Sequence, residues 1–175
     1  MAILHGWRLC PRCGGELDRS RAPARLDCPA CGFVAHANSA PTAGAIVEDE
    51  AGRILLARRA IEPFRGMWDI PGGYLDEGEH PLDGMRRELL EETGLVVEPV
   101  RFLGAFMDTY GDSPDANATL NLFWTARVVS GEPVAADDVA ELRWFRPGEI
   151  PQAQELAFTL LPRVLEAWRE TRTSG

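Results

Sequence analysis

Apolar segments bounded by turn residues predict strands over most of the central part of this chain. Two apolar segments, at 40–49 and 52–60, flank the turn sequence DEAG and are typical of paired strands. Further strand-like segments lie at 95–110, 118–129 and 141–145, and the first of these is long enough for one strand or two short ones. Nothing in the chain repeats internally.

Helical spacing replaces the strand-like pattern between Pro81 and Thr93, where apolar residues recur at three- and four-residue intervals: Leu82, Met85 and Leu89. Pro81 is favoured at the first position of a helix, where its missing N–H is not needed. Gly94 stands where helices commonly end. Gly84 weakens a helix by about 1 kcal/mol, and we interpret it as a site of close packing.

A second helical pattern closes the chain, with its apolar residues at Ala157, Leu160, Leu161, Val164, Leu165 and Trp168. Strands, a helix, further strands and a helix predict an α/β sandwich, in which a mixed sheet lies between helices. We expect this fold to occupy residues 37–175 and a small separate domain to occupy residues 1–36.

All four cysteines lie in that small domain, in two C-x2-C pairs: Cys10 with Cys13 and Cys28 with Cys31. Each pair has the sequence C-P-x-C-G, a turn that directs backbone N–H groups toward thiolate sulfurs. Two such turns predict a tetrahedral zinc site of the zinc-ribbon type. Sites of four thiolates are structural, and zinc would supply folding energy that so short a segment cannot obtain from a core.

A redox C-x-x-C pair and structural disulfides are the competing interpretations of the cysteines. Redox pairs usually occur singly inside a βαβ unit. Disulfides require an oxidising compartment, which nothing in the sequence indicates. The spacing therefore favours Zn²⁺.

Three glutamates of the predicted first helix, Glu88, Glu91 and Glu92, share one face because each helical residue advances by about 100°. Their mutual repulsion calls for a cation, and a hard ion such as Mg²⁺ prefers oxygen ligands and bridges carboxylates to phosphates. A solvated acidic face is the alternative. Gly72 and Gly73, in a glycine-rich loop that we expect after a strand at Trp68, favour the cation, because glycines let backbone approach a ligand closely.

Charge and composition exclude several classes of function. The net charge is −9 and all 18 basic residues are arginine, which excludes lysine Schiff bases and a Walker-type phosphate loop. The acidity also argues against a broad nucleic-acid surface. No apolar run approaches the ~18 residues of a membrane span, and the start lacks a secretory signal pattern. We therefore expect a cytoplasmic protein without a membrane partner.

The segment from Gly73 to Leu95 resembles the Nudix box, G-x5-E-x7-R-E-U-x-E-E-x-G-U, in which U is a bulky aliphatic residue. Every fixed position matches: Gly73, Glu79, Arg87, Glu88, Leu89, Glu91, Glu92, Gly94 and Leu95. The resemblance implies a Nudix fold over roughly residues 40–165 and a hydrolase that cleaves nucleoside diphosphates linked to another moiety. It implies Mg²⁺ or Mn²⁺ ligands at Glu88, Glu91, Glu92 and the carbonyl of Gly72, with Arg87 orienting the carboxylates.

Both the diphosphate and the chain are anionic, so divalent ions are needed to reverse the local charge and to lower the pKa of a bound water. Water is expected to attack one phosphorus without a covalent intermediate. Glu88 or Glu92 could accept its proton. In many relatives the base lies in a later acidic loop, here with the candidates Asp137, Asp138 and Glu141, of which we choose Asp138.

The substrate stays open at this point. A zinc ribbon ahead of a Nudix box resembles the NADH, ADP-ribose and FAD pyrophosphatases, but the S-Q-P-W-type signature of the NADH group is missing from residues 102–117. ADP-ribose, FAD, NADH and nucleoside triphosphates all remain candidates. Loops carry specificity, so we expect substrate contacts from Phe64, Arg65, Tyr110 and the turn at 111–117.

A nucleotide-sensing regulator that binds nucleic acid or protein through the ribbon is the alternative function. A third is an interaction module with residual hydrolase activity. The ribbon has five arginines against three acidic residues, but zinc bound to four thiolates would cancel this excess of two charges. All box carboxylates are present, so we favour catalysis and regard nucleic acid as an improbable partner. The resemblance is also compatible with a homodimer.

Overall fold

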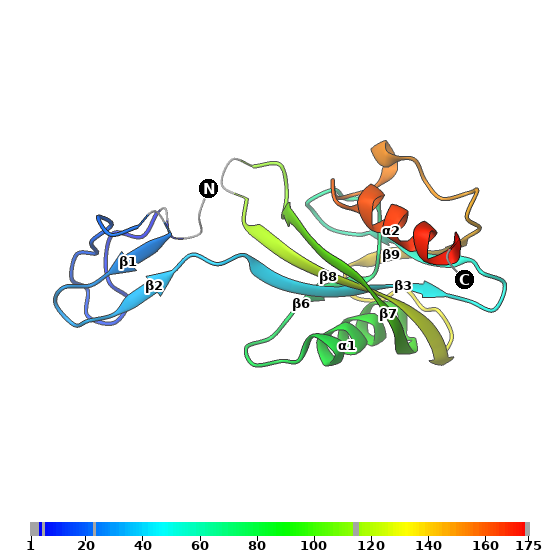
Figure 1. Ribbon diagram of the computed structural model, residues 1–175, viewed down its shortest axis with the longest axis horizontal. Coiled ribbons are helices and arrows are strands. Elements are labelled where there is room, and N and C mark those ends of the chain that lie inside the picture. Colours follow the sequence, from blue (N-terminus) through cyan, green and yellow to red (C-terminus); the bar gives the residue numbers. More distant parts are fainter. Residues whose placement is uncertain (1–3, 5, 23, 114–115, 174–175) are drawn as a thin grey trace.

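The computed structural model describes residues 4, 6–22, 24–113 and 116–173, which form two separate sheets (Figure 1). The small sheet pairs β1 (Arg25–Asp27) with β2 (Val34–His36) in antiparallel fashion. An isolated bridge between Leu9 and Glu16 closes the first cysteine-containing turn. Residues 37–39 lead directly from β2 into the large sheet.

The large sheet has seven strands: β3 (Ala40–Glu48), β4 (Ile54–Arg59), β5 (Trp68–Asp69), β6 (Gly72–Tyr74), β7 (Val96–Thr109), β8 (Ala118–Ser130) and β9 (Val139–Phe145). The order is β5-β4-β3-β8-β7, with β6 paired to β3 and β9 to β4. β3 and β8 run parallel, whereas the other pairs are antiparallel. The predicted mixed sheet is confirmed.

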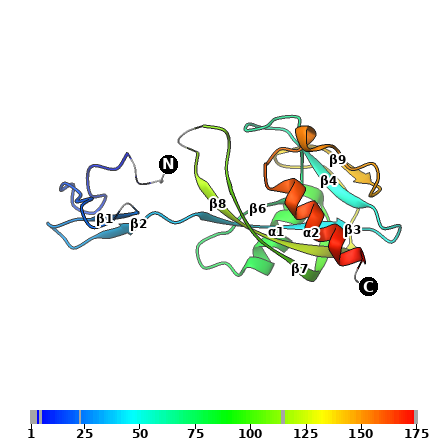
Figure 2. The same cartoon turned by 45° about the horizontal axis from the view of Figure 1, so that its top comes forward.

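Two helices, α1 (Pro81–Thr93) and α2 (Leu161–Thr173), cover opposite faces of this sheet (Figures 1 and 2). The single turn η1 (Ala153–Glu155) precedes α2. Neither helix is long and apolar enough to cross a lipid bilayer, and this holds for all described residues.

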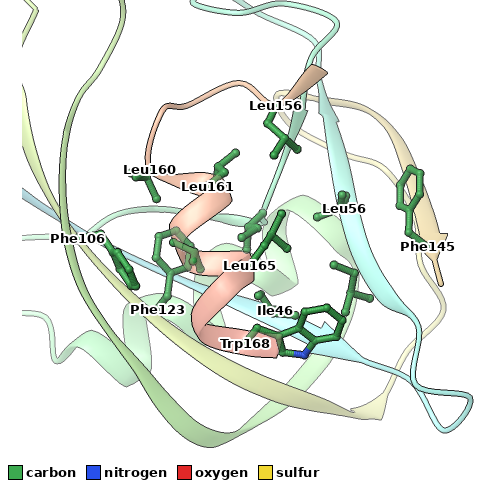
Figure 3. Packing of buried hydrophobic residues seen from close by; sticks show 13 residues of the cluster. Ile46, Leu56, Phe106, Phe123, Phe145, Leu156, Leu160, Leu161, Leu165 and Trp168 are labelled. Carbon is green, nitrogen blue, oxygen red and sulfur yellow. The ribbon is translucent and has the colours of Figure 1, made fainter. Parts of the chain in front are cut away.

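Alternating side chains along the strands build one core on each face. The core under α1 joins Met85 and Leu89 to strand residues of the same face: Ala43, Ala45, Val47 and Leu55. The core under α2 joins that helix to strand residues that alternate with those of the first core. Figure 3 shows Ile46, Leu56, Phe123, Leu165 and Trp168 packed together there. The sheet is therefore buried on both sides, and the predicted α/β sandwich is confirmed.

Two expectations about element boundaries need correction. The glycine-rich loop expected after the strand at Trp68 itself contains a strand, β6, which pairs with a different neighbour from β5. The closing helix begins at Leu161, so Ala157 and Leu160 are buried but lie before it. Asp108 fixes this start, because its carboxylate accepts the backbone N–H of Leu160 over 2.9 Å.

Candidate active site and metal centres

Local signals define α1, which spans Pro81–Thr93 as predicted. Nδ1 of His80 accepts the backbone N–H of Leu82 over 3.3 Å, so His80 caps the start of the helix. Gly94 has a φ of 70°, and its N–H donates to the carbonyl of Leu90 over 2.9 Å. These ends fix which side chains of the helix point toward the sheet.

Gly72 and Gly73, which precede the helix, must be glycines because neighbouring atoms lie too close to their Cα atoms for a side chain to fit. A Cβ on Gly72, where φ is 147°, would lie 2.4 Å from Cα of Gly44 on the neighbouring strand. A Cβ on Gly73 would lie 2.4 Å from the carboxyl carbon of Glu88. Larger residues at either position would push β6 away from β3 or from α1.

Close packing also explains the glycine at position 84. A Cβ there would lie 2.3 Å from Cδ2 of Leu75 and 2.7 Å from Oε2 of Glu79. The loop between β6 and α1 thus lies directly on the helix, which confirms the interpretation of Gly84 as a site of close packing.

Arg87 forms the centre of an ion-pair network. Its Nε and Nη2 donate to the two oxygens of Glu79, both over 2.9 Å, and Nη2 also donates to the carbonyl of Tyr74 over 3.0 Å. Its Nη1 reaches Glu88 over 2.7 Å and Glu91 over 3.2 Å. The hydrogen bonds from Arg87 lower the pKa of Glu79 to about 2. A single guanidinium therefore positions three carboxylates of the box.

Glu92 is the buried acid of the trio. Its Oε2 accepts the backbone N–H of Gly72 over 2.9 Å, and the residue is 8% exposed. Burial raises the pKa of Glu92 to about 9, and the neighbouring charges of Asp138, Asp69 and Glu88 act in the same direction. A carboxyl group that is buried next to other negative charges is stabilised by binding a cation or a proton.

Asp69 belongs to the site, although sequence reasoning missed it. It is a partly buried residue of β5 whose Oδ2 lies 3.3 Å from Nη1 of Arg59, and its Oδ1 accepts the backbone N–H of Ile70 over 2.8 Å. Burial raises the pKa of Asp69 to about 6, although Arg59 opposes the shift. An acidic residue between the apolar residues Trp68 and Ile70, three positions before Gly72, was the signal for it.

A small cavity brings Asp69, Glu92 and Asp138 together between β4, β6 and the start of β9. Asp138, the residue that we chose as the candidate base, therefore lies beside Glu92 of the box. The two other loop candidates do not line this cavity in the described part of the chain. Glu141 instead pairs with Arg58 over 3.4 Å at the surface, and Asp137 is exposed.

The three box glutamates differ from a preformed metal cage. Among the described residues they do not form a group whose ligand atoms lie close enough together to hold a metal ion. Glu88 and Glu91 reach Arg87, whereas Glu92 reaches Gly72. Burial also raises the pKa of Glu88. Oxygen donors that are buried or crowded by like charges are a chemical fit for a hard divalent cation.

A cleft opens beside the acidic cavity and shares Arg59, Asp69, Ile70 and Gly72 with it. Aromatic rings line it, at Tyr74, Tyr110, Phe123 and Phe158. The ring centroid of Tyr110 lies 5.7 Å from that of Tyr74 and 5.7 Å from that of Phe158. Tyr74 is 40% exposed.

Of the described loop residues that we predicted to contact substrate, only some line this cleft. Tyr110 lines it. Phe64 packs edge-on against Phe158, with ring centroids 5.2 Å apart, and therefore supports the lining from behind. Arg65 is not among the described residues that line the cleft. The predicted turn at 111–117 includes residues 114–115, which lie outside the described residues.

The four cysteines converge in the N-terminal sheet region. Their Sγ atoms all lie within 4.8 Å of one another, with Cys10 and Cys31 separated by 3.7 Å and Cys13 and Cys28 by 3.6 Å. None of the four cysteines is in a disulfide bond. These separations match the ~3.8 Å edge of a tetrahedron with Zn–S bonds of about 2.3 Å.

Both cysteine turns have the same backbone. The N–H groups of Gly14 and Gly32 donate to the carbonyls of Cys10 and Cys28, each over 2.9 Å. Gly14 has a φ of 74° and Gly32 one of 72°. The geometry is that of two matched knuckles facing each other, which fits a closed zinc site of four thiolates and disfavours disulfides.

Comparison with known proteins agrees with this architecture. The ADP-ribose pyrophosphatase of Methanocaldococcus jannaschii is 32% identical over 110 residues, covering 61% of this chain and 62% of that protein. The mitochondrial NAD(P)H pyrophosphatase NUDT13 of mouse is 26% identical over 189 residues, covering 96% of this chain and 52% of that protein. This chain thus spans less than two thirds of the length of either relative.

A solved structure extends the likeness to nearly the whole chain. The crystal structure of a Nudix hydrolase from Nitrosomonas europaea superposes with a TM-score of 0.80 at 28% identity, covering 97% of this chain and 94% of the other. The profile of the NUDIX domain family matches residues 38–165, which include the box, the acidic cavity and the aromatic cleft. This chain belongs to the Nudix family.

Proposed function

We propose that this chain is a divalent-metal-dependent pyrophosphohydrolase. Its substrate would be a nucleoside diphosphate derivative such as ADP-ribose, FAD or NADH. The observation that supports this most is the buried Glu92, held by the N–H of Gly72 and joined in one cavity by Asp69 and Asp138. The names of the M. jannaschii and mouse relatives support the same class of reaction.

Glu88, Glu91, Glu92 and the carbonyl of Gly72 would hold Mg²⁺ or Mn²⁺. When bound, the ion supplies positive charge against the diphosphate and lowers the pKa of a water. Arg87 keeps Glu88 and Glu91 on the substrate side of the helix through its bonds to both carboxylates and to Glu79. Arg87 therefore acts as a positioning residue.

Asp138 would accept the proton of the attacking water. It lines the same cavity as Glu92, and its carboxylate is not tied to α1, whereas Glu92 is fixed by the backbone of Gly72. A carboxylate within one water of the reacting proton meets the geometric requirement of a general base. Water attack on one phosphorus with departure of the other phosphate needs no protein nucleophile.

The proposed zinc at Cys10, Cys13, Cys28 and Cys31 is structural, because four thiolates close its coordination sphere. The boundary between the zinc ribbon and the Nudix domain is proposed at residues 36 and 37. It fits the end of β2 at His36 and the start of the family match at residue 38.

A substrate panel tests the proposed function. ADP-ribose, FAD, NADH and nucleoside triphosphates are incubated with the protein in Mg²⁺, in Mn²⁺ and in EDTA, and released AMP or other monophosphate is measured. We expect release from at least one dinucleotide substrate that depends on the metal and is abolished by EDTA. Hydrolysis that persists in EDTA, or no hydrolysis of any compound with either metal, contradicts the proposal.

A further inference from the structure

The aromatic cleft has a polar floor made by Thr42 on β3 with Thr119 and Asn121 on β8. Thr42 and Asn121 are direct neighbours in the parallel register of these strands. Thr119 and Asn121 are 4% and 8% exposed. Polar groups at such depth are costly unless they are bonded to each other or to a ligand.

The orientation of the Asn121 amide is fixed by its neighbours. Nδ2 donates to the backbone carbonyl of Phe106 over 3.2 Å, and a carbonyl can only accept. The second N–H of Nδ2 donates to Oγ1 of Thr119 over 2.9 Å. Oδ1 therefore faces Thr42 and accepts its hydroxyl over 2.8 Å. The amide cannot be reversed without placing two acceptors against each other.

This network leaves one donor and one acceptor for a ligand. Thr42 uses its hydroxyl hydrogen on Asn121, so only lone pairs remain on its oxygen. Thr119 accepts from Asn121, so its own hydroxyl hydrogen is available, and no acceptor for it is found among the described residues. Thr42 thus presents a hydrogen-bond acceptor to a ligand, and Thr119 presents a hydrogen-bond donor.

The walls of the cleft suit a flat ring. Tyr110 and Phe158 are held by Arg59, whose guanidinium carbon lies 5.7 Å and 5.3 Å from their ring centroids. Arg59 also donates from Nη2 to the hydroxyl of Tyr110 over 2.9 Å. Rings fixed in this way can stack on a planar ligand without further ordering.

We propose that Thr42 and Thr119 select the heterocyclic base of the substrate. The base they fit presents an N–H donor to Thr42 and a neighbouring acceptor to Thr119, as the amino group and a ring nitrogen of adenine do. Gly72 and Gly73 line the same cleft, so the base lies next to the backbone that adjoins the box. This inference relies on the proposed function only in taking the substrate to contain a nucleotide.

Binding of AMP tests the inference without hydrolysis. Dissociation constants are measured in EDTA for AMP and for purine riboside 5′-monophosphate, which lacks the 6-amino group. We expect AMP to bind about 5- to 10-fold more tightly, as the loss of one hydrogen bond to a buried partner implies. Thr42→Val should abolish this preference, whereas Thr42→Ser, which keeps the hydroxyl, should restore it.

Thr119→Val should weaken both ligands equally, because both contain the ring nitrogens. Thr125→Val is the matched control, since Thr125 is a buried threonine of the same strand that does not line the cleft. It should leave both dissociation constants unchanged. An AMP preference that survives Thr42→Val, or an effect of Thr125→Val equal to that of Thr119→Val, overturns the inference.

The two proposals fail separately. If the AMP preference behaves as expected but no dinucleotide is hydrolysed, the catalytic proposal is wrong and the base site stands. If a dinucleotide is hydrolysed but the wild type binds both monophosphates equally, the base site is wrong and catalysis stands.

Discussion

The backbone N–H of Gly72 and Oε2 of Glu92 are joined by a hydrogen bond of 2.9 Å. The bond connects β6 to the last turn of α1 and fixes the most buried acid of the site through main chain. Since Asp69 and Asp138 line the same cavity, the position of Glu92 sets the spacing of the whole acidic group. Substitutions that disturb this spacing should therefore affect hydrolysis before they affect the fold.

Glu92→Gln should lower the turnover number for a hydrolysed dinucleotide at least about 100-fold, as expected for loss of a metal ligand or base. The amide keeps an acceptor for Gly72, so the fold should persist. Initial rates of AMP release in Mg²⁺ measure the effect. Glu50→Gln, at an exposed turn, is the control and should retain full activity. Robust turnover by Glu92→Gln would contradict the role of this residue.

The same substitution should change how stability depends on pH. The pKa of Glu92 is raised from 4.5 to about 9 in the folded protein. Between these values the folded state holds a proton that the unfolded chain has lost, so metal-free stability falls as the pH rises through this window. Thermal unfolding in EDTA should show a declining Tm from pH 5 to 9 for wild type and a shallower decline for Glu92→Gln. If Tm falls with pH equally in the wild type and in Glu92→Gln, Glu92 is already ionised in the folded protein.

Arg87→Lys should lose most activity, because an ammonium cannot donate to both oxygens of Glu79 and also reach Glu88. We expect a fall in turnover of about 10-fold or more, together with a weaker apparent Mg²⁺ affinity. Arg86→Lys is the control, since Arg86 pairs with Asp83 and Glu98 at the surface. Equal effects of the two substitutions would remove the positioning role of Arg87.

Gly73→Ala should displace the Glu88 carboxylate, because the new Cβ would lie 2.4 Å from its carboxyl carbon. We expect about 10-fold or greater loss of turnover and a destabilisation of about 1–3 kcal/mol. Gly148→Ala is the control, since nothing lies within 4 Å of the added methyl. Urea unfolding and initial rates separate the two effects. Unchanged rates for Gly73→Ala would show that Glu88 can move without consequence.

Removal of the zinc-binding thiols should affect the N-terminal sheet and spare the Nudix cores. The wild type should contain one zinc per chain by elemental analysis, and Cys28→Ser should reduce this content strongly. Both cores of the large sheet consist of residues from Ala43 onward, so the main thermal transition should persist. Freely titrating thiols and no zinc in the wild type would refute the four-thiolate site.

Local signals explain the parts of the structure that sequence reasoning predicted well. Pro81 and Gly94 set the ends of α1 within the chain itself, without help from distant residues. The repeated C-P-x-C-G turns likewise specify both knuckles locally. Strand positions followed from apolar segments bounded by turn residues, because a sheet buried under helices on both faces needs apolar side chains at successive positions.

Long-range pairing explains what the sequence left open. Asp69 and Asp138 meet only because β4 pairs with β5 on one side and β9 on the other. The neighbours Thr42 and Asn121 depend on the parallel register of β3 and β8. Helical spacing also predicted too early a start for α2, because Ala157 and Leu160 are buried in irregular chain.

The short connection between the two sheets has a practical consequence. His36 ends β2, Ala40 begins β3 and Thr42 already lies in the cleft floor, so about 20 Å of extended chain separates the cysteine-bearing unit from the base site. A shortened protein that starts within β3 would lose the part of β3 that leads into the cleft floor. Truncations meant to isolate the hydrolytic half should therefore begin at about residue 37, ahead of Ala40.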